Sequence, residues 1–148
     1  MLQQLEDPLK PEAAPKRKAV CRRIGPLVIL LQGKDAPTDT EWHEVIRLVS
    51  TTDDINNTQV LVVTDGGGPS LAQRQSLENV LRGTKVCSAV VSDSVKVRFI
   101  VATVALFSSK ISSFTSREIH KAYEYLGLSG SQIALAEKAL AEMKLLIA

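Results

Sequence analysis

The stretch Val60–Ser70, VLVVTDGGGPS, decides the fold of this chain, together with the amphipathic run Leu71–Arg82 that follows it. The four apolar residues at its start predict a strand buried on both faces, as in a parallel sheet. Asp65 then stands at the carboxyl end of the strand, three glycines and a proline form a sharp turn, and Ser70 is placed to cap the next helix. In open α/β sheets, ligands and partners bind at this edge.

The length and composition of the chain are those of one globular domain. Its 148 residues suffice for a sizeable core, and 45% of them are hydrophobic and 23% charged. The charge is unevenly distributed: Met1–Arg23 holds six basic and three acidic residues, whereas the remainder holds 12 basic and 13 acidic ones. Because the body is nearly neutral, we expect no nucleic-acid partner.

The sequence predicts no membrane span, no secretory signal and no cofactor. The longest apolar run, Phe99–Phe107, is too short to cross a bilayer. Cys21 and Cys87 do not have the spacing of a metal or redox site. We therefore expect a cytoplasmic protein.

The chain is predicted to begin with a flexible basic tail, Met1–Lys18, which carries three prolines and the Lys16-Arg17-Lys18 run. Ala19–Ile24 and Leu27–Leu31 then predict an antiparallel edge hairpin. Beyond the hairpin, strands and helices alternate, which favours right-handed crossovers between parallel strands. The predicted fold is thus α/β, with a mainly parallel sheet of four to five strands and flanking helices over residues 19–128.

Capping and turn signals delimit the later elements. Thr38 with Glu41, Ser70 with Gln73, and Thr115 with Glu118 form potential capping boxes. Leu71 and Leu77 are expected to face the core. An extra C-terminal helix is expected to pack on the domain within residues 129–148. The predicted elements are a helix from Thr38 to Val49, strand Gln59–Thr64, helix Leu71–Arg82, strand Val86–Val91, helix Val95–Phe107, strand Ile111–Phe114, a helix ending at Gly127, and helix Ser131–Ile147.

The turn Gly66-Gly67-Gly68 has two interpretations. It could bind a phosphorylated small molecule or a nucleotide, because bare amides at a helix start favour an anion. The sequence favours the other interpretation, a structural turn, since Pro69 and Leu71 stand where known phosphate-binding fingerprints need other residues. Asp65 is expected to accept hydrogen bonds from the amides of this turn.

No catalytic constellation accompanies the turn. A phospho-accepting receiver needs two acids after its first parallel strand, and Gln32–Asp35 supplies only one. His43 and His120 are expected on the surfaces of separate helices. No GxSxG elbow is present. The sequence therefore predicts a protein that is not an enzyme.

The predicted helix Val95–Phe107 is apolar on almost every side, so more than one side must be covered. One of its stripes consists of Val95, Phe99, Ala102 and Leu106. Three kinds of contact could bury the apolar sides of this helix: packing of the C-terminal helix, a protein interface such as a homodimer through this helix, or a lipid contact.

The order of elements and the closing motifs resemble the STAS domain over residues 19–128. The motifs are Ile111–Phe114, the capping box Thr115–Glu118, and Ala122–Gly127, which reads Ala-x-x-Tyr-Leu-Gly. STAS is the fold of bacterial anti-sigma-factor antagonists. The resemblance implies a non-catalytic regulatory or scaffolding module in signalling, which binds another protein.

The resemblance also implies where the site lies. Family antagonists carry Asp-Ser-Ser-Gly at the helix start after the central strand, and a partner kinase phosphorylates a serine there. This chain has Asp65–Ser70 at that place, without the paired serines, so Ser70 is the residue in a similar location. The candidate partner-binding or regulatory residues lie in the two strand-end turns and are Asp65, Gly66, Gly67, Gly68, Ser70, Asp93 and Ser94.

Overall fold

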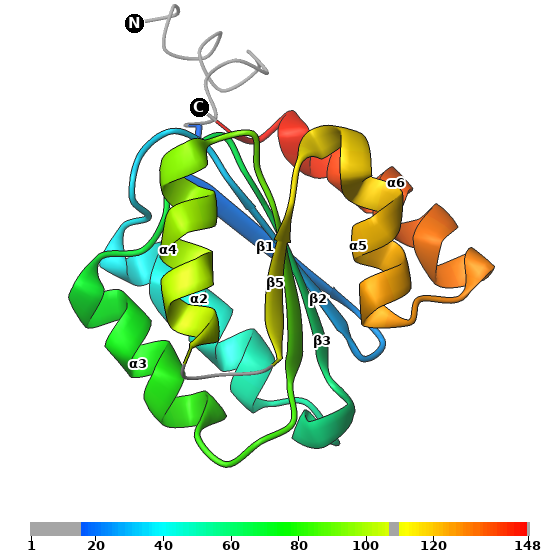
Figure 1. The fold of residues 1–148 in the computed structure, drawn as a ribbon, viewed down its shortest axis with the longest axis horizontal. Helices are drawn as coiled ribbons and strands as arrows, with labels where there is room; N and C mark the ends of the chain where they lie inside the picture. The colour runs from blue at the N-terminus through cyan, green and yellow to red at the C-terminus, as the bar shows by residue number, and fades with distance from the viewer. Residues whose placement is uncertain (1–15, 107–109, 148) are drawn as a thin grey trace, which may run out of the picture.

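A mixed sheet of five strands is the centre of the fold, in the order β1-β2-β3-β4-β5 (Figure 1). The computed structural model describes residues 16–106 and 110–147. β1 and β2 form the predicted antiparallel hairpin, and β2 to β5 pair in parallel. The α/β class and the mainly parallel sheet are therefore confirmed. The strands are β1 (Ala19–Ile24), β2 (Leu27–Gln32), β3 (Gln59–Thr64), β4 (Cys87–Val91) and β5 (Ile111–Phe114).

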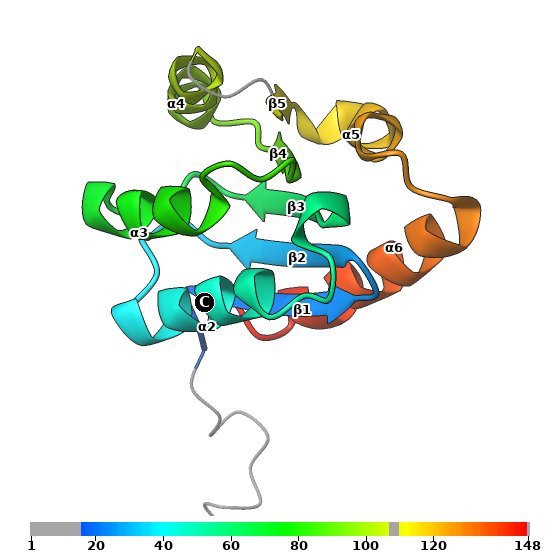
Figure 2. The ribbon, with the colours of Figure 1, turned by 90° about the horizontal axis from the view of Figure 1, so that it is seen from below.

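Five α-helices cover the two faces of the sheet in the described residues. Three of them connect successive parallel strands, and right-handed crossovers place all three on one face. Figure 2 shows α2, α3 and α4 on that face and α5 and α6 on the other. The helices are α2 (Asp39–Ser50), α3 (Leu71–Leu81), α4 (Val95–Ala105), α5 (Ile119–Leu126) and α6 (Gly130–Lys144).

The face under α5 and α6 holds one continuous hydrophobic core. Leu61 of β3, Tyr123 of α5 and Met143 of α6 are almost completely buried in it. The C-terminal helix packs on the domain at β1 and β2, so it covers the sheet face opposite α4. No helix among the described residues combines the length and the apolar composition that crossing a bilayer requires.

The predicted starts of α2, α3 and α4 are confirmed, whereas α5 begins after a 3-10 turn and α6 begins at Gly130, one residue before the prediction. The capping boxes at Thr38 and Ser70 are both formed. The box at Thr115 is formed too, with Glu118 accepting a hydrogen bond from the Thr115 amide at 2.9 Å, but it opens one turn of 3-10 helix, Ser116–Glu118, which precedes α5. Gly127 ends α5 at φ +70°, a left-handed conformation that glycine adopts without strain.

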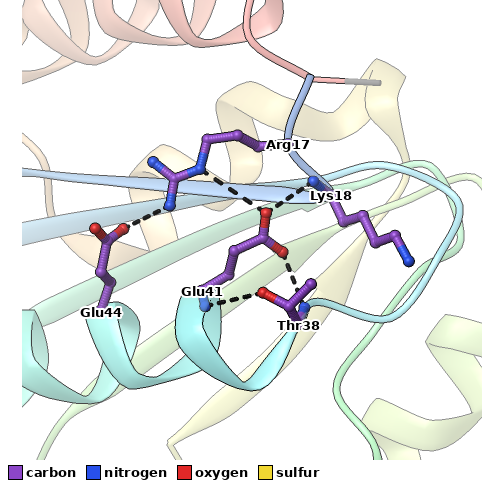
Figure 3. A network of polar contacts seen from close by, with 5 residues as sticks. All are labelled: Arg17, Lys18, Thr38, Glu41 and Glu44. Atoms are coloured by element: carbon purple, nitrogen blue, oxygen red, sulfur yellow. Dashed lines mark hydrogen bonds and ion pairs between the residues drawn. The ribbon is translucent and has the colours of Figure 1, made fainter. Parts of the chain in front are cut away.

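The Lys16–Lys18 run, which the sequence analysis assigned to the tail, is held against the domain. The Arg17 amide donates to the Leu146 carbonyl at 2.8 Å, next to the bridge between Arg17 and Ile147. The Arg17 side chain pairs with Glu44 at 2.8 Å (Figure 3). The tail boundary at Lys18 was therefore wrong, because backbone and ion-pair contacts fix these residues. Residues 1–15 lie outside the described part of the chain, as do residues 107–109 at the predicted end of the helix that begins at Val95.

Glu41 joins this segment to α2. One carboxylate oxygen accepts from the Thr38 amide at 2.9 Å and completes the capping box, while the other accepts from the Lys18 amide at 3.0 Å (Figure 3). Burial opposes the negative charge of Glu41, but these amide hydrogen bonds outweigh it and hold the pKa of Glu41 below its ordinary value. The buried Glu41 carboxylate thus caps α2 and holds the backbone at Lys18, immediately before β1.

Candidate functional site

The turns after β3 and β4 lie side by side at the carboxyl edge of the sheet. A Cβ built on Gly66 would lie 4.0 Å from the Ser94 Cβ. Asp65, Asp93 and Ser94 line a cleft of about 520 Å³ at this edge, together with Ser116. The structure therefore brings three of the predicted site residues together in one place, which we call the edge cleft.

Asp93 and Ser94 are both engaged in local hydrogen bonds. The Asp93 carboxylate accepts from the Ser116 amide at 2.8 Å and from the Ser116 hydroxyl at 2.7 Å. These bonds stabilise the charged form and lower the pKa of Asp93. The Ser94 hydroxyl accepts from the Val97 amide at 3.3 Å and so caps α4. Asp93 thus ties the turn after β4 to the start of the 3-10 turn before α5.

Thr64, rather than Asp65, organises the glycine turn. The Thr64 hydroxyl accepts from the Gly66 amide at 3.1 Å and donates to the Gly67 carbonyl at 2.5 Å. The Asp65 side chain is exposed and makes no hydrogen bond within the described residues. The prediction for Asp65 was wrong, because the hydroxyl of the buried Thr64 makes the hydrogen bonds to the glycine turn in its place.

Gly67 is required by close packing. A Cβ at this position would lie 2.7 Å from the Gly33 carbonyl oxygen and even closer to the carbonyl oxygen of Asp35. The Gly67 amide donates to the Gly33 carbonyl at 2.9 Å. Since the amides of Gly66 and Gly67 are both used inside the protein, the arrangement supports a structural turn more than an anion cradle. A Cβ on Gly68, by contrast, would meet nothing within 4 Å.

Ser70 caps α3 and lies outside the edge cleft. Its hydroxyl accepts from the Gln73 backbone amide at 3.2 Å, and Gln73 Oε1 accepts from the Ser70 amide at 2.9 Å. The side chain of Gln73 is buried, and its Nε2 also donates to the Pro37 carbonyl and to Asp39 of α2. Sequence reasoning found Gln73 as a cap but missed this link between α2 and α3, because a capping glutamine gives no signal of a second partner.

The outer side of α4 carries an exposed apolar stripe. Val95, Phe99 and Leu106 are 72%, 69% and 80% exposed, and Ala102 between them is exposed as well. We call these four residues the α4 outer stripe. Because α6 lies on the opposite sheet face, the proposed cover of α4 by the C-terminal helix is wrong. Leu71 at the start of α3 is also exposed, at 62%, in contrast to its predicted core position.

A groove of about 840 Å³ opens between α3 and α4 above β3 and β4. We call it the α3–α4 groove. Gly66, Gly67 and Gly68 line it, so six of the seven predicted site residues divide between this groove and the edge cleft, and Ser70 lines neither. Sequence reasoning missed it, because an amphipathic pattern shows which side of a helix is apolar but not how far apart two neighbouring helices stand. Its apolar lining comes from the sheet and from α2, α3 and α4, and includes Leu30, Trp42, Val45, Val60, Val62, Leu77, Leu81, Val90, Val97, Ile100, Val101 and Val104.

The two histidines line neither the α3–α4 groove nor the edge cleft. His43 and His120 are exposed on α2 and α5, as predicted. Nowhere in residues 16–106 and 110–147 do three His, Cys, Asp or Glu side chains come together as a metal would require.

The comparisons with known proteins add no relative to this geometry: no family model, no curated protein and no solved structure matches the chain.

Proposed function

We propose that this chain is a non-catalytic regulatory module of the STAS type, which binds another protein through the carboxyl edge of its sheet. The observation that carries the proposal is the α4 outer stripe, which starts beside the Asp93–Ser94 turn and leaves three large apolar side chains in water. Large exposed apolar side chains that gather on one helix are typical of protein interfaces. The edge hairpin, the sequential parallel strands and the helix after β5 support the STAS assignment.

Ser70 is the residue at which phosphorylation would regulate this binding. It is exposed, and as the N-cap of α3 it lies at the positive end of the helix dipole, which tolerates a phosphate. The added negative charge would be placed at the edge where the partner docks. An apolar or acidic partner surface would then be repelled.

The test compares three forms of the full chain as bait in extracts of the cells that make it. Phe99→Lys places a charge in the middle of the α4 outer stripe, and Leu135→Lys places the same charge on α6, at a residue that is 50% exposed on the other sheet face. We expect wild type and Leu135→Lys to recover the same protein in the same amount, and Phe99→Lys to lose it. Recovery by all three forms would contradict the proposed surface.

In the homodimer hypothesis, the partner is a second copy of this chain. Sedimentation of wild type and of the same two variants tests it, since only Phe99→Lys should shift a dimer to monomer. Val101 is not a suitable position, because it is 6% exposed and faces the sheet. Gly67→Arg is equally unsuitable as a contact mutant, because any side chain there would collide with the Gly33–Asp35 loop.

A further inference from the structure

The α3–α4 groove is a built cavity of the size and lining that small ligands occupy. Ligand sites in proteins commonly enclose about 300–1,000 Å³ and are mostly apolar with a few polar groups, and this groove has about 840 Å³. Its floor includes Val60, Val62 and Val90, whereas Leu77 of α3 and Ile100 of α4 stand on its two walls. Both helices lie on the same sheet face in Figure 2.

The charged residues at the groove give it a preference for anions. Four basic side chains line it and only one acidic side chain, Glu78, does so. Arg74 and Lys96 each lie in the first turn or so of a helix that starts at the carboxyl edge, so they mark that end of the groove. Arg82 and Lys110 lie after α3 and before β5, near the other end.

Two buried nitrogens in the groove lining lack a hydrogen-bond partner. They are Gln32 Nε2 and Arg74 Nε, and they are two of the three such buried side-chain atoms in the described residues. Gln32 is only 2% exposed, and the alternation of β2 places it on the sheet face of Val28 and Leu30, away from the core under α5 and α6. Buried donors are almost always satisfied in native proteins. Both atoms are donors, so an acceptor in the groove, either a water molecule or an atom of a ligand, would satisfy them.

We propose that the α3–α4 groove binds a small amphipathic anion with an acyl chain. The chain would lie along Val62, Val90 and Ile100, and the acidic head group would accept hydrogen bonds from Gln32 and Arg74. Lys96 adds a positive charge at the same end. This site is separate from the α4 outer stripe, which lies on the outer side of the same helix, so it does not depend on the proposed protein partner.

The test uses dodecanoate as the probe, with two ligands of equal chain length as controls, dodecanol and dodecyltrimethylammonium. Calorimetry gives affinity and stoichiometry, and Trp42 fluorescence gives the location, since Trp42 is the only tryptophan and lines the groove. We expect one dodecanoate per chain, a change in Trp42 emission, and binding about tenfold or more tighter than that of dodecanol. The cationic ligand should not bind.

Two kinds of variant separate the head-group contact from the chain contact. Arg74→Gln should weaken dodecanoate about tenfold while leaving dodecanol unchanged, and Arg117→Gln, an exposed arginine outside the groove, should change neither. Val62→Phe fills the floor and should abolish binding of both ligands. Val104→Phe on the half-buried α4 wall is the second blocking variant if Val62→Phe does not fold, with circular dichroism as the check.

Several outcomes would overturn the proposal. These are no binding of dodecanoate at millimolar concentration, equal binding of the cationic ligand, or an affinity of Arg74→Gln equal to that of wild type. Binding of several molecules per chain that Val62→Phe leaves intact would place the ligand on the α4 outer stripe instead. A wild-type dimer that Val62→Phe converts to monomer would make a second copy the occupant and would also contradict the proposal.

Discussion

The two faces of the sheet are built from the same strands but differ in how tightly they are covered. Under α5 and α6, the buried side chains form one continuous cluster. Under α2, α3 and α4, they fall into three smaller clusters, and Val62 borders all of them. We call the first the closed face and the second the open face.

The alternation of side chains along each strand makes this division possible. Leu61 points to the closed face and is fully buried, whereas its neighbour Val62 points to the open face and remains partly exposed at the groove. Because a close-packed core supplies most of the stability of a small domain, the closed face can hold the fold while the open face keeps a groove. A protein that binds through one side of a sheet needs this separation.

The largest expected effect is on the closed face. Met143→Ala should lower the free energy of unfolding by about 3 kcal/mol, because it removes a completely buried side chain and leaves a cavity. Val104→Ala on the open face should cost under about 1 kcal/mol, since the half-buried valine already borders the groove. Urea unfolding with an unchanged m-value measures both. Equal costs would show that the two faces do not differ as described.

A smaller effect is expected at the end of the groove. Gly67→Ala should cost about 2 kcal/mol, because the new methyl group would overlap the carbonyl oxygens of Gly33 and Asp35 and force the backbone apart. Gly68→Ala is the matched control and should change stability by no more than about 0.5 kcal/mol, since open space surrounds that position. Thermal unfolding of the pair decides whether close packing explains the turn. Similar melting temperatures for both variants would argue against it.

The smallest expected effect is at the start of α3. Ser70→Ala should cost about 1 kcal/mol through loss of the cap, and Ser70→Asp should stay near wild type because aspartate caps a helix as well. Ser76→Ala, an exposed serine further along α3, should be neutral. Chemical denaturation compares the three variants. If Ser70→Asp keeps both stability and partner binding, then Ser70 acts only as a cap.

The sequence predicted elements well where local signals were strong. The strands at Ala19–Ile24, Gln59–Thr64 and Ile111–Phe114 have the predicted bounds, and the capping pairs of Thr38 and Ser70 are in place. These signals depend on residues within one turn or one strand of each other. Such contacts are visible in a single sequence.

The sequence failed where the outcome depended on distant contacts. Arg17 lies in a proline-rich, polar stretch, and nothing local showed that Glu44 and Leu146 would hold it. The apolar pattern of α4 was visible, but it gave no indication that α6 would cover the opposite sheet face. The groove likewise depends on the spacing of α3 and α4, which is set by packing across the sheet. The sequence therefore predicted which edge of the sheet carries the candidate residues, but not the groove between α3 and α4.

The packing of α6 on β1 and β2 has a consequence for the order in which the chain folds. Strands β1 and β2 are synthesised before the described helices, and α6, which covers their closed face, is the last of those helices. Contacts between such distant segments form slowly, and uncovered strands are prone to aggregate in the meantime. During translation, the β1–β2 hairpin would therefore present an open apolar surface to the ribosome exit and to chaperones until α6 has emerged. The closed face at β1 and β2 therefore stays uncovered until α6 has been synthesised.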